Sequence, residues 1–206
     1  MAVGIAGHND SVFINCPFDD TYTPLLQAIV YTVYRCGFIP QSALGADDAT
    51  DNRLDKIIRY IKYCRYGIHD LSRIELNVSG FPRFNMPFEL GIFFGAKKIG
   101  TVLQRNKTAL IFERVKYTYQ QFISDLNGID TKAHSDDPII IVREIRNWLK
   151  TESRRTSIPV QARLVADFRD FIANYLTVAA TAGLDPASIS FNDFCLIVEE
   201  DVRTRV

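Results

Sequence analysis

Short apolar runs alternate along the chain with longer stretches of helical periodicity, and this alternation limits the fold to the α/β class. The segments 12–16, 38–41, 66–70 and 108–112 each have the length of a short strand; the first and the last are the most apolar, and 66–70 carries an acid at its carboxyl end. Helical spacing fills the chain between them, which favours a parallel sheet with helices wound on both faces. We therefore predict a doubly wound, mainly parallel sheet of about five strands, of the Rossmann/flavodoxin-like kind.

End signals and apolar spacing locate the helices. Pro24 suits the first turn of one helix, with Thr23 as its cap and Gly37 as the residue that ends it. The segment 38–41 contains Pro40, which indicates an edge strand. The other predicted helices cover 53–62, 87–98, 117–126, 138–150, 160–181 and 186–202. The polar stretch 152–157 is a candidate linker, so we predict an α/β domain over 1–150 and a linker with a C-terminal helical extension over 151–206.

Composition narrows the setting without naming a function. Lys plus Arg and Asp plus Glu number 24 each, so the formal net charge is zero and gives no reason to propose nucleic acid. No apolar run is long enough to cross a membrane, and the start is not typical of a signal peptide. The four cysteines are scattered without a CxxC pair, which favours reduced thiols in a cytoplasmic protein over disulfides or a metal site.

Three polar segments fall where a predicted strand ends or a helix begins: 15–20, 69–73 and 83–91. In open parallel sheets the ligand binds at this edge, where loops converge and helix N-termini offer positive dipole ends. The chain has neither GxGxxG after its first strand nor GxxxxGK[ST], so the usual Gly-rich phosphate loops are absent. We therefore expect a pocket built from side chains and helix starts.

Glu89 is the strongest candidate for a reactive group. It follows Pro87 by two residues, so we expect it in the first helical turn, where the dipole should lower the pKa of its carboxyl. An ionised carboxylate suits a nucleophile or an electrostatic stabiliser. An acid in a first turn is also an ordinary complement to the helix N-terminus.

Asp70 closes a strand predicted to be buried. It either forms an Asx-type turn with Ser72 or Arg73, or it reaches into the pocket. Facing a common cavity with Glu89 beside Pro17, it would give two carboxylates in unlike environments, one able to hold a proton while the other stays charged. The neighbouring His69 is interpreted as a satisfied core histidine.

Arginines near the three segments have two interpretations. Arg53, Arg73 and Arg83 either meet a phosphate or carboxylate of the ligand or pair with nearby acids. The acids in question are Asp47, Asp48 and Asp51. Asp19 and Asp20 would repel a phosphorylated ligand unless these arginines offset their charge.

The ordered motifs resemble a known group. A strand ending in Asn-Cys-Pro-Phe-Asp-Asp, a strand ending in His-Asp-Leu-Ser-Arg, and Asn-Met-Pro-Phe-Glu-Leu-Gly together resemble the nucleoside 2-deoxyribosyltransferase-like superfamily, which is related in fold to TIR domains, and in particular an uncharacterised bacterial branch of it. The resemblance spans roughly 12–150. It implies Glu89 as the nucleophile and Asp70 as a substrate-binding or proton-handling group. Candidate substrate-binding residues are Asn15, Pro17, Phe18, Arg53, Ser72, Arg73, Asn85 and Met86.

The resemblance also implies a function. We expect cleavage or base exchange at the N-glycosidic bond of a small-molecule nucleoside, nucleotide or NAD, with no cofactor and with NAD as a possible substrate. The alternative is a non-catalytic nucleotide-sensing or assembly module. Kinship with TIR domains implies a homo-oligomer, and family association alone suggests a role in bacterial defence.

Overall fold

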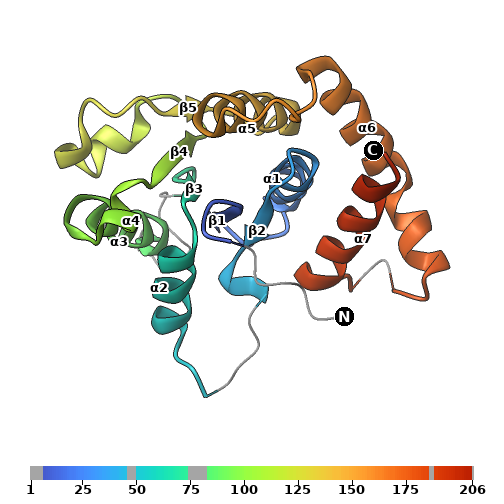
Figure 1. Ribbon diagram of the computed structural model, residues 1–206, viewed down its shortest axis with the longest axis horizontal. Helices are drawn as coiled ribbons and strands as arrows, with labels where there is room; N and C mark the ends of the chain where they lie inside the picture. Colours follow the sequence, from blue (N-terminus) through green and yellow to red (C-terminus); the bar gives the residue numbers. More distant parts are fainter. Residues whose placement is uncertain (1–6, 46–49, 74–82, 186–187, 206) are drawn as a thin grey trace. The chain divides into compact units, whose positions relative to one another are not determined.

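The computed structural model describes residues 7–45, 50–73, 83–185 and 188–205, and its centre is a five-stranded parallel sheet. The strands are β1 (Ser11–Asn15), β2 (Ile39–Gln41), β3 (Tyr66–Asp70), β4 (Thr108–Glu113) and β5 (Lys132–Ala133), in the order β2-β1-β3-β4-β5 (Figure 1). This order is that of a doubly wound α/β fold, as predicted, and β2 is at an edge.

Burial explains which strands the sequence reveals. Every residue of β1 and β3 is buried, and each strand has a neighbour on both sides, so apolar side chains fill the centre of β1 and the first half of β3, while Asn15, His69 and Asp70 are buried polar groups at the carboxyl ends. The two-residue strand β5 was not predicted. It exists through its pairing with β4, Lys132 opposite Phe112 and Ala133 opposite Glu113, and two residues carry no periodic signal.

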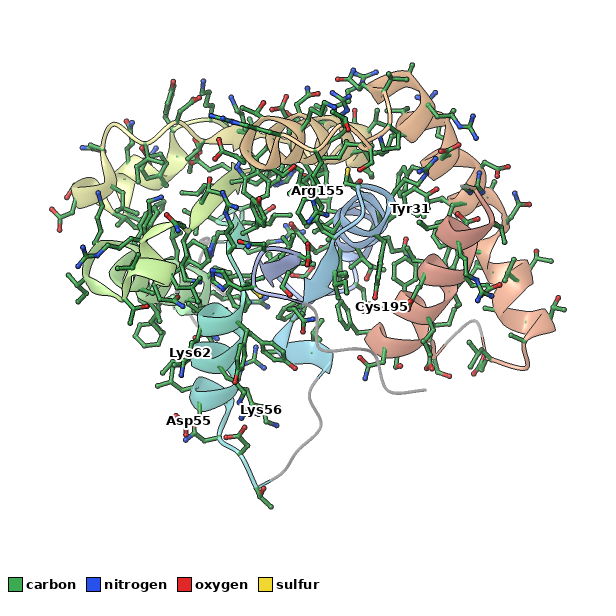
Figure 2. The ribbon with its side chains drawn as sticks, in the orientation of Figure 1. Tyr31, Asp55, Lys56, Lys62, Arg155 and Cys195 are labelled. Carbon is green, nitrogen blue, oxygen red and sulfur yellow. The ribbon has the colours of Figure 1, made fainter. Side chains whose placement is uncertain are left out.

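Three helices pack near the sheet within its own unit: α2 (Arg53–Tyr63), α3 (Asn85–Ile99) and the short α4 (Val102–Arg105) (Figure 1). The helix α2 begins after Asn52, whose side chain accepts a hydrogen bond from the Asp55 backbone N–H at 2.9 Å. Its polar residues Asp55, Lys56 and Lys62 can be followed along the helix in Figure 2. Ile57 and Ile61 lie on the opposite, buried face.

The predicted helix over 117–126 is wrong. That segment forms two 3₁₀ turns, η2 (Thr118–Gln121) and η3 (Ser124–Leu126). Tyr117 has a left-handed backbone with φ of 68°, which an α-helix does not allow. The Glu113 carboxylate accepts hydrogen bonds from the N–H groups of Tyr117 and Tyr119, and it therefore replaces the helical carbonyls as acceptor. A third 3₁₀ turn, η1 (Ala43–Gly45), follows β2.

The remaining helices are α1 (Thr23–Arg35), α5 (Pro138–Ser153), α6 (Gln161–Thr181) and α7 (Phe191–Thr204). Gly37 ends α1 as predicted: its φ is 79°, its N–H donates to the Tyr34 carbonyl at 2.8 Å, and the Phe38 N–H donates to the Val33 carbonyl at 3.0 Å. Ser190 begins α7 through a capping box with Asp193, later in the chain than the predicted start at 186, which lies outside the described residues.

The chain divides into two compact units. One contains 1–23 and 39–137, and the other contains 24–38 and 138–206. The predicted boundary after residue 150 instead falls inside α5. Within the second unit α1 packs with the C-terminal helices, because Tyr31 lies against Phe168 and Phe171 at ring distances of 5.5 and 4.9 Å. In the described part of the chain no helix is long and apolar enough to cross a membrane.

Candidate functional site

A cavity of about 260 Å³ opens at the carboxyl ends of the sheet, beside the end of β1 and the start of α3. After β1 the chain runs to β2 on one side, and after β3 it runs to β4 on the other side. The gap between the carboxyl ends of β1 and β3 is therefore the topological switch point of the sheet. The lining residues are Asn15, Cys16, Pro17, Phe18, Arg53, Arg83, Asn85, Met86 and Glu89.

Asn15 joins the end of β1 to the start of α3. Its Nδ2 atom donates to the Met86 carbonyl at 2.9 Å and lies 3.0 Å from Nδ1 of His69. His69 is fully buried, with its ring edge-on to Phe13 and Phe93. Burial lowers the pKa of His69 to about 3, so the ring stays neutral and holds Asn15 in place. His69 is a core residue, as expected, but its Nε2 atom has no hydrogen-bond partner among the described residues, so the ring is not fully satisfied.

Glu89 lines the cavity, and the prediction of a lowered pKa is wrong. The helix α3 begins at Asn85, so Glu89 lies in the second turn, beyond the free amides of the first. Glu89 is 7 % exposed, and its carboxyl makes no hydrogen bond or ion pair with any residue that the structure describes. Burial raises the pKa of Glu89 to about 7, although the positive charge of Arg53 opposes the shift.

Asp70 is buried away from the cavity, which corrects the expectation that both carboxylates share one hollow. Its Oδ1 accepts from the Ser72 N–H at 2.8 Å in the predicted Asx-type turn, and its Oδ2 accepts from the Tyr22 hydroxyl at 2.5 Å. The Nε2 atom of His134 lies 3.2 Å from the same Oδ2. Burial alone would raise the pKa of Asp70, but the nearby His134 imidazole and the hydrogen bonds from Ser72 and Tyr22 outweigh it and lower the pKa.

The two carboxylates therefore have unlike surroundings, but they do not share a cavity and their expected properties are reversed. Glu89 can hold a proton near neutral pH, and Asp70 stays charged. Tyr22 and His134 were not predicted as partners of Asp70, and no local pattern indicates them. His134 follows β5, a strand without a sequence signature, and its Nδ1 accepts from the Asp136 N–H at 2.9 Å.

Ser72 and Arg73, predicted to bind substrate, do not line this cavity. The Ser72 N–H is used by Asp70, and its side chain lies beside a second hollow of about 310 Å³ at the ends of β3 and β4. Arg73 donates to Thr21 Oγ1 at 2.6 Å and lies 3.6 Å from the Asp19 carboxylate. Both residues therefore make their contacts within the loops at the switch point, and neither lines the cavity.

The arginines at the cavity have unequal partners. Arg83 lies 3.4 Å from the Asp19 carboxylate, which it shares with Arg73, so the expected repulsion by Asp19 is offset. Arg53 makes no ion pair or hydrogen bond with any residue that the structure describes, and Asp51 pairs with Arg59 instead. Asp47 and Asp48, the other predicted partners, lie outside the described residues.

Cys16 lines the cavity but is not a candidate nucleophile. Burial raises the pKa of its thiol well above the ordinary value, and the negative charges of Asp70 and Glu89 add to this effect. All four cysteines are free thiols, three of them buried. Within the described ranges, no group of three His, Cys, Asp or Glu side chains is arranged to hold a metal ion.

Comparison with known proteins adds no family. No family model matches the chain, and no curated protein matches it.

Proposed function

We propose that the chain cleaves or exchanges the N-glycosidic bond of a nucleoside, nucleotide or NAD, with Glu89 as the carboxylate that meets the anomeric carbon. The observation that carries the proposal is the environment of Glu89. A buried carboxyl without a partner costs folding free energy, and such groups concentrate at functional sites. This one lines a cavity at the switch point of a parallel sheet, where ligands of such folds bind.

The chemistry needs a single carboxylate at the sugar. An Oε atom of Glu89 forms a bond to the anomeric carbon while the bond from that carbon to the base nitrogen breaks. The bonding pair leaves with the base: a purine or pyrimidine then takes a proton from solvent, whereas the nicotinamide of NAD leaves as a neutral molecule and needs none. Water then adds to the anomeric carbon and loses a proton, so the carboxylate is released with the free sugar. In base exchange, a second base takes the place of water. NAD would enter as a substrate, and no cofactor is needed.

The test compares three proteins on the same substrate mixture. Deoxynucleosides, ribonucleosides, nucleoside 5′-monophosphates and NAD are incubated with the wild type, with Glu89→Gln and with Glu152→Gln, and free base or nicotinamide is measured by chromatography. Glu152 is an exposed residue of α5 and serves as the matched control. We expect turnover by the wild type and Glu152→Gln, and a loss of about 100-fold or more in Glu89→Gln. Equal background turnover in all three proteins would refute the proposal.

One observation favours a second function, a non-catalytic nucleotide sensor. Glu89 is the sole acidic side chain among the described residues that line the cavity, so Asp70 cannot assist the leaving base there. A sensor would bind the ligand without consuming it, and Glu89→Gln would retain binding. Isothermal calorimetry and light scattering, with chromatography of the recovered ligand, separate the two functions.

A further inference from the structure

We infer that the cavity selects a phosphorylated ligand, a nucleoside 5′-monophosphate, and that Arg53, Arg83 and the start of α3 surround its phosphate. The inference rests on the proposed function for the sugar end of the ligand, whereas the phosphate end is argued from charge and geometry and is tested by binding alone.

The charged side chains at the cavity are positive on balance. Arg53 and Arg83 line it together with a single acid, Glu89, which is partly protonated near neutral pH. The carboxylate of Asp19, nearest to Arg83, is shared with Arg73, so it cannot neutralise both guanidinium groups. Arg53 makes no hydrogen bond or ion pair with a described residue, and the one described acid on which its charge is seen to act is Glu89. A guanidinium is suited to a phosphate, because it offers two parallel N–H donors.

The beginning of α3 adds backbone donors at the same place. Phe84 stands at the N-cap position and makes no side-chain capping bond, so the N–H groups of Asn85 and Met86 lack that acceptor; Pro87 has no N–H, and the Phe88 N–H donates to the Phe84 carbonyl at 2.9 Å. Asn85 and Met86, the first two residues of α3, line the cavity. A helix start of this kind binds anions through its N–H groups and its positive dipole end.

A second, independent feature marks the hollow as a ligand site. Glu89 is 7 % exposed, lines the same hollow, and makes no hydrogen bond or ion pair with a described residue. A ligand that places its phosphate at the arginines and its sugar at Glu89 would keep the two negative groups apart.

Size and the rim of the cavity favour a mononucleotide. The volume of about 260 Å³ is close to the lower end of the roughly 300–1,000 Å³ of ligand pockets, which is small for an entire dinucleotide such as NAD. Phe18 lines the cavity with 38 % of its surface exposed, so its ring is available to stack on a base.

The experiment measures binding in the Glu89→Gln protein, which prevents turnover. Calorimetry compares a panel of nucleoside 5′-monophosphates with the matching nucleosides and with inorganic phosphate. The same titrations are run in Arg53→Gln, Arg83→Gln and the control Arg59→Gln, each combined with Glu89→Gln. Arg59 lies on α2 like Arg53 but pairs with Asp51 outside the cavity lining. Circular dichroism checks that each variant is folded.

We expect at least one monophosphate to bind about tenfold or more tightly than its nucleoside, and this preference to weaken in high salt. Arg53→Gln and Arg83→Gln should each reduce the preference, and Arg59→Gln should retain it. Equal affinity for nucleoside and monophosphate, no binding of either, or an undiminished preference in both arginine variants would overturn the inference. Monophosphate binding without cleavage by the wild type would instead refute the proposed function alone, and cleavage of nucleosides with no phosphate preference would refute this inference alone.

Discussion

At the scale of the residue, two acids near one edge of the sheet acquire opposite properties from their surroundings. Asp70 is fully buried yet keeps a lowered pKa, because a backbone amide, a hydroxyl and an imidazole surround its two oxygens. Glu89 is slightly more exposed, yet burial raises its pKa, and no hydrogen bond from a described residue offsets that effect. The number of hydrogen bonds that each buried carboxyl accepts from the protein thus decides which of the two acids is available to a ligand.

The raised pKa of Glu89 predicts a pH-dependent gain in stability from Glu89→Gln. The folded-state pKa, about 7, is above the ordinary 4.5, so the folded protein binds this proton more tightly than the unfolded chain does. The unfolding free energy of the wild type therefore decreases as the pH rises from 4.5 to about 7, relative to that of a variant that does not titrate in this range. We expect the variant to be more stable by about 2 kcal/mol above pH 7 than the wild type, after allowance for solvent screening.

Urea unfolding at several pH values checks this prediction. The difference between Glu89→Gln and the wild type should be smallest in acid, grow as the pH rises through the window, and stay constant above it. Glu152→Gln, an exposed control, should show no such growth. A difference that does not vary with pH would contradict the raised pKa.

The same pKa sets the expected pH dependence of turnover. If Glu89 acts as an ionised nucleophile, kcat/KM rises as the pH passes through about 7 and levels off above it. Arg53 opposes the raised pKa, so Arg53→Gln should move the midpoint of this rise to higher pH, and Arg59→Gln should leave it in place. Rates that fall through the same range would show that Glu89 acts as an acid.

Asp70 is expected to matter for folding. Tyr22→Phe removes one hydrogen bond to a buried carboxylate and should cost about 1–2 kcal/mol. Asp70→Asn places an amide donor among the Ser72 N–H and Tyr22 O–H donors, and we expect a cost of about 3 kcal/mol or more. Chemical denaturation measures both. Loss of turnover in Asp70→Asn with unchanged stability would return Asp70 to the role in substrate handling that the sequence suggests.

Sequence analysis could predict those site residues that lie at the end of a strand or at the start of a helix. Asn15 ends β1 and Asn85 begins α3, and both line the cavity. The pKa of Glu89 could not be predicted, because a helix start two residues earlier moves it out of the first turn. The partners of Asp70 come from remote segments that carry no pattern.

At the scale of the element, the sequence predicts what local chemistry decides. The buried strands and the helices with clear apolar spacing are recognisable from sequence alone. The segment after β4 is not recognisable, because one side chain determines its backbone conformation. The Glu113 carboxylate accepts hydrogen bonds from the Tyr117 and Tyr119 N–H groups and from the Thr131 hydroxyl. The strand β5 likewise depends on its partner strand.

The start of α2 offers a matched pair of substitutions. Asn52→Ala removes the side-chain acceptor for the Asp55 N–H and should cost about 1 kcal/mol, whereas Asn52→Gly should cost only a few tenths. Thermal and urea unfolding of the two variants measure the difference. Equal losses of stability in the two variants would show that the Asn52 cap does not determine where α2 begins, and so does not position Arg53 at its first turn.

At the scale of the whole molecule, the two units are interleaved in sequence. The helix α1 follows β1 and precedes β2, yet it belongs to the unit of the C-terminal helices. Arg35 on α1 lies 2.9 Å from the Asp167 carboxylate on α6, with both side chains largely buried, and the Tyr31 hydroxyl donates to Asp201 on α7 at 3.3 Å. The C-terminal helices therefore complete a core that begins inside the α/β sequence.

Deletion of 158–206 is therefore expected to prevent cooperative folding. The deletion would remove the helices that bury the Tyr31 ring and pair with Arg35, and would expose the apolar face of α1 to water, where each large apolar side chain loses about 1.5–3 kcal/mol of burial free energy. Size-exclusion chromatography and calorimetry should show an aggregated or non-cooperative chain. Asp167→Asn in the full chain, which weakens the ion pair and keeps the helices, should remain folded with a lower midpoint. A truncated chain that unfolds cooperatively at the wild-type temperature would show that these helices are the independent extension indicated by the polar stretch before them.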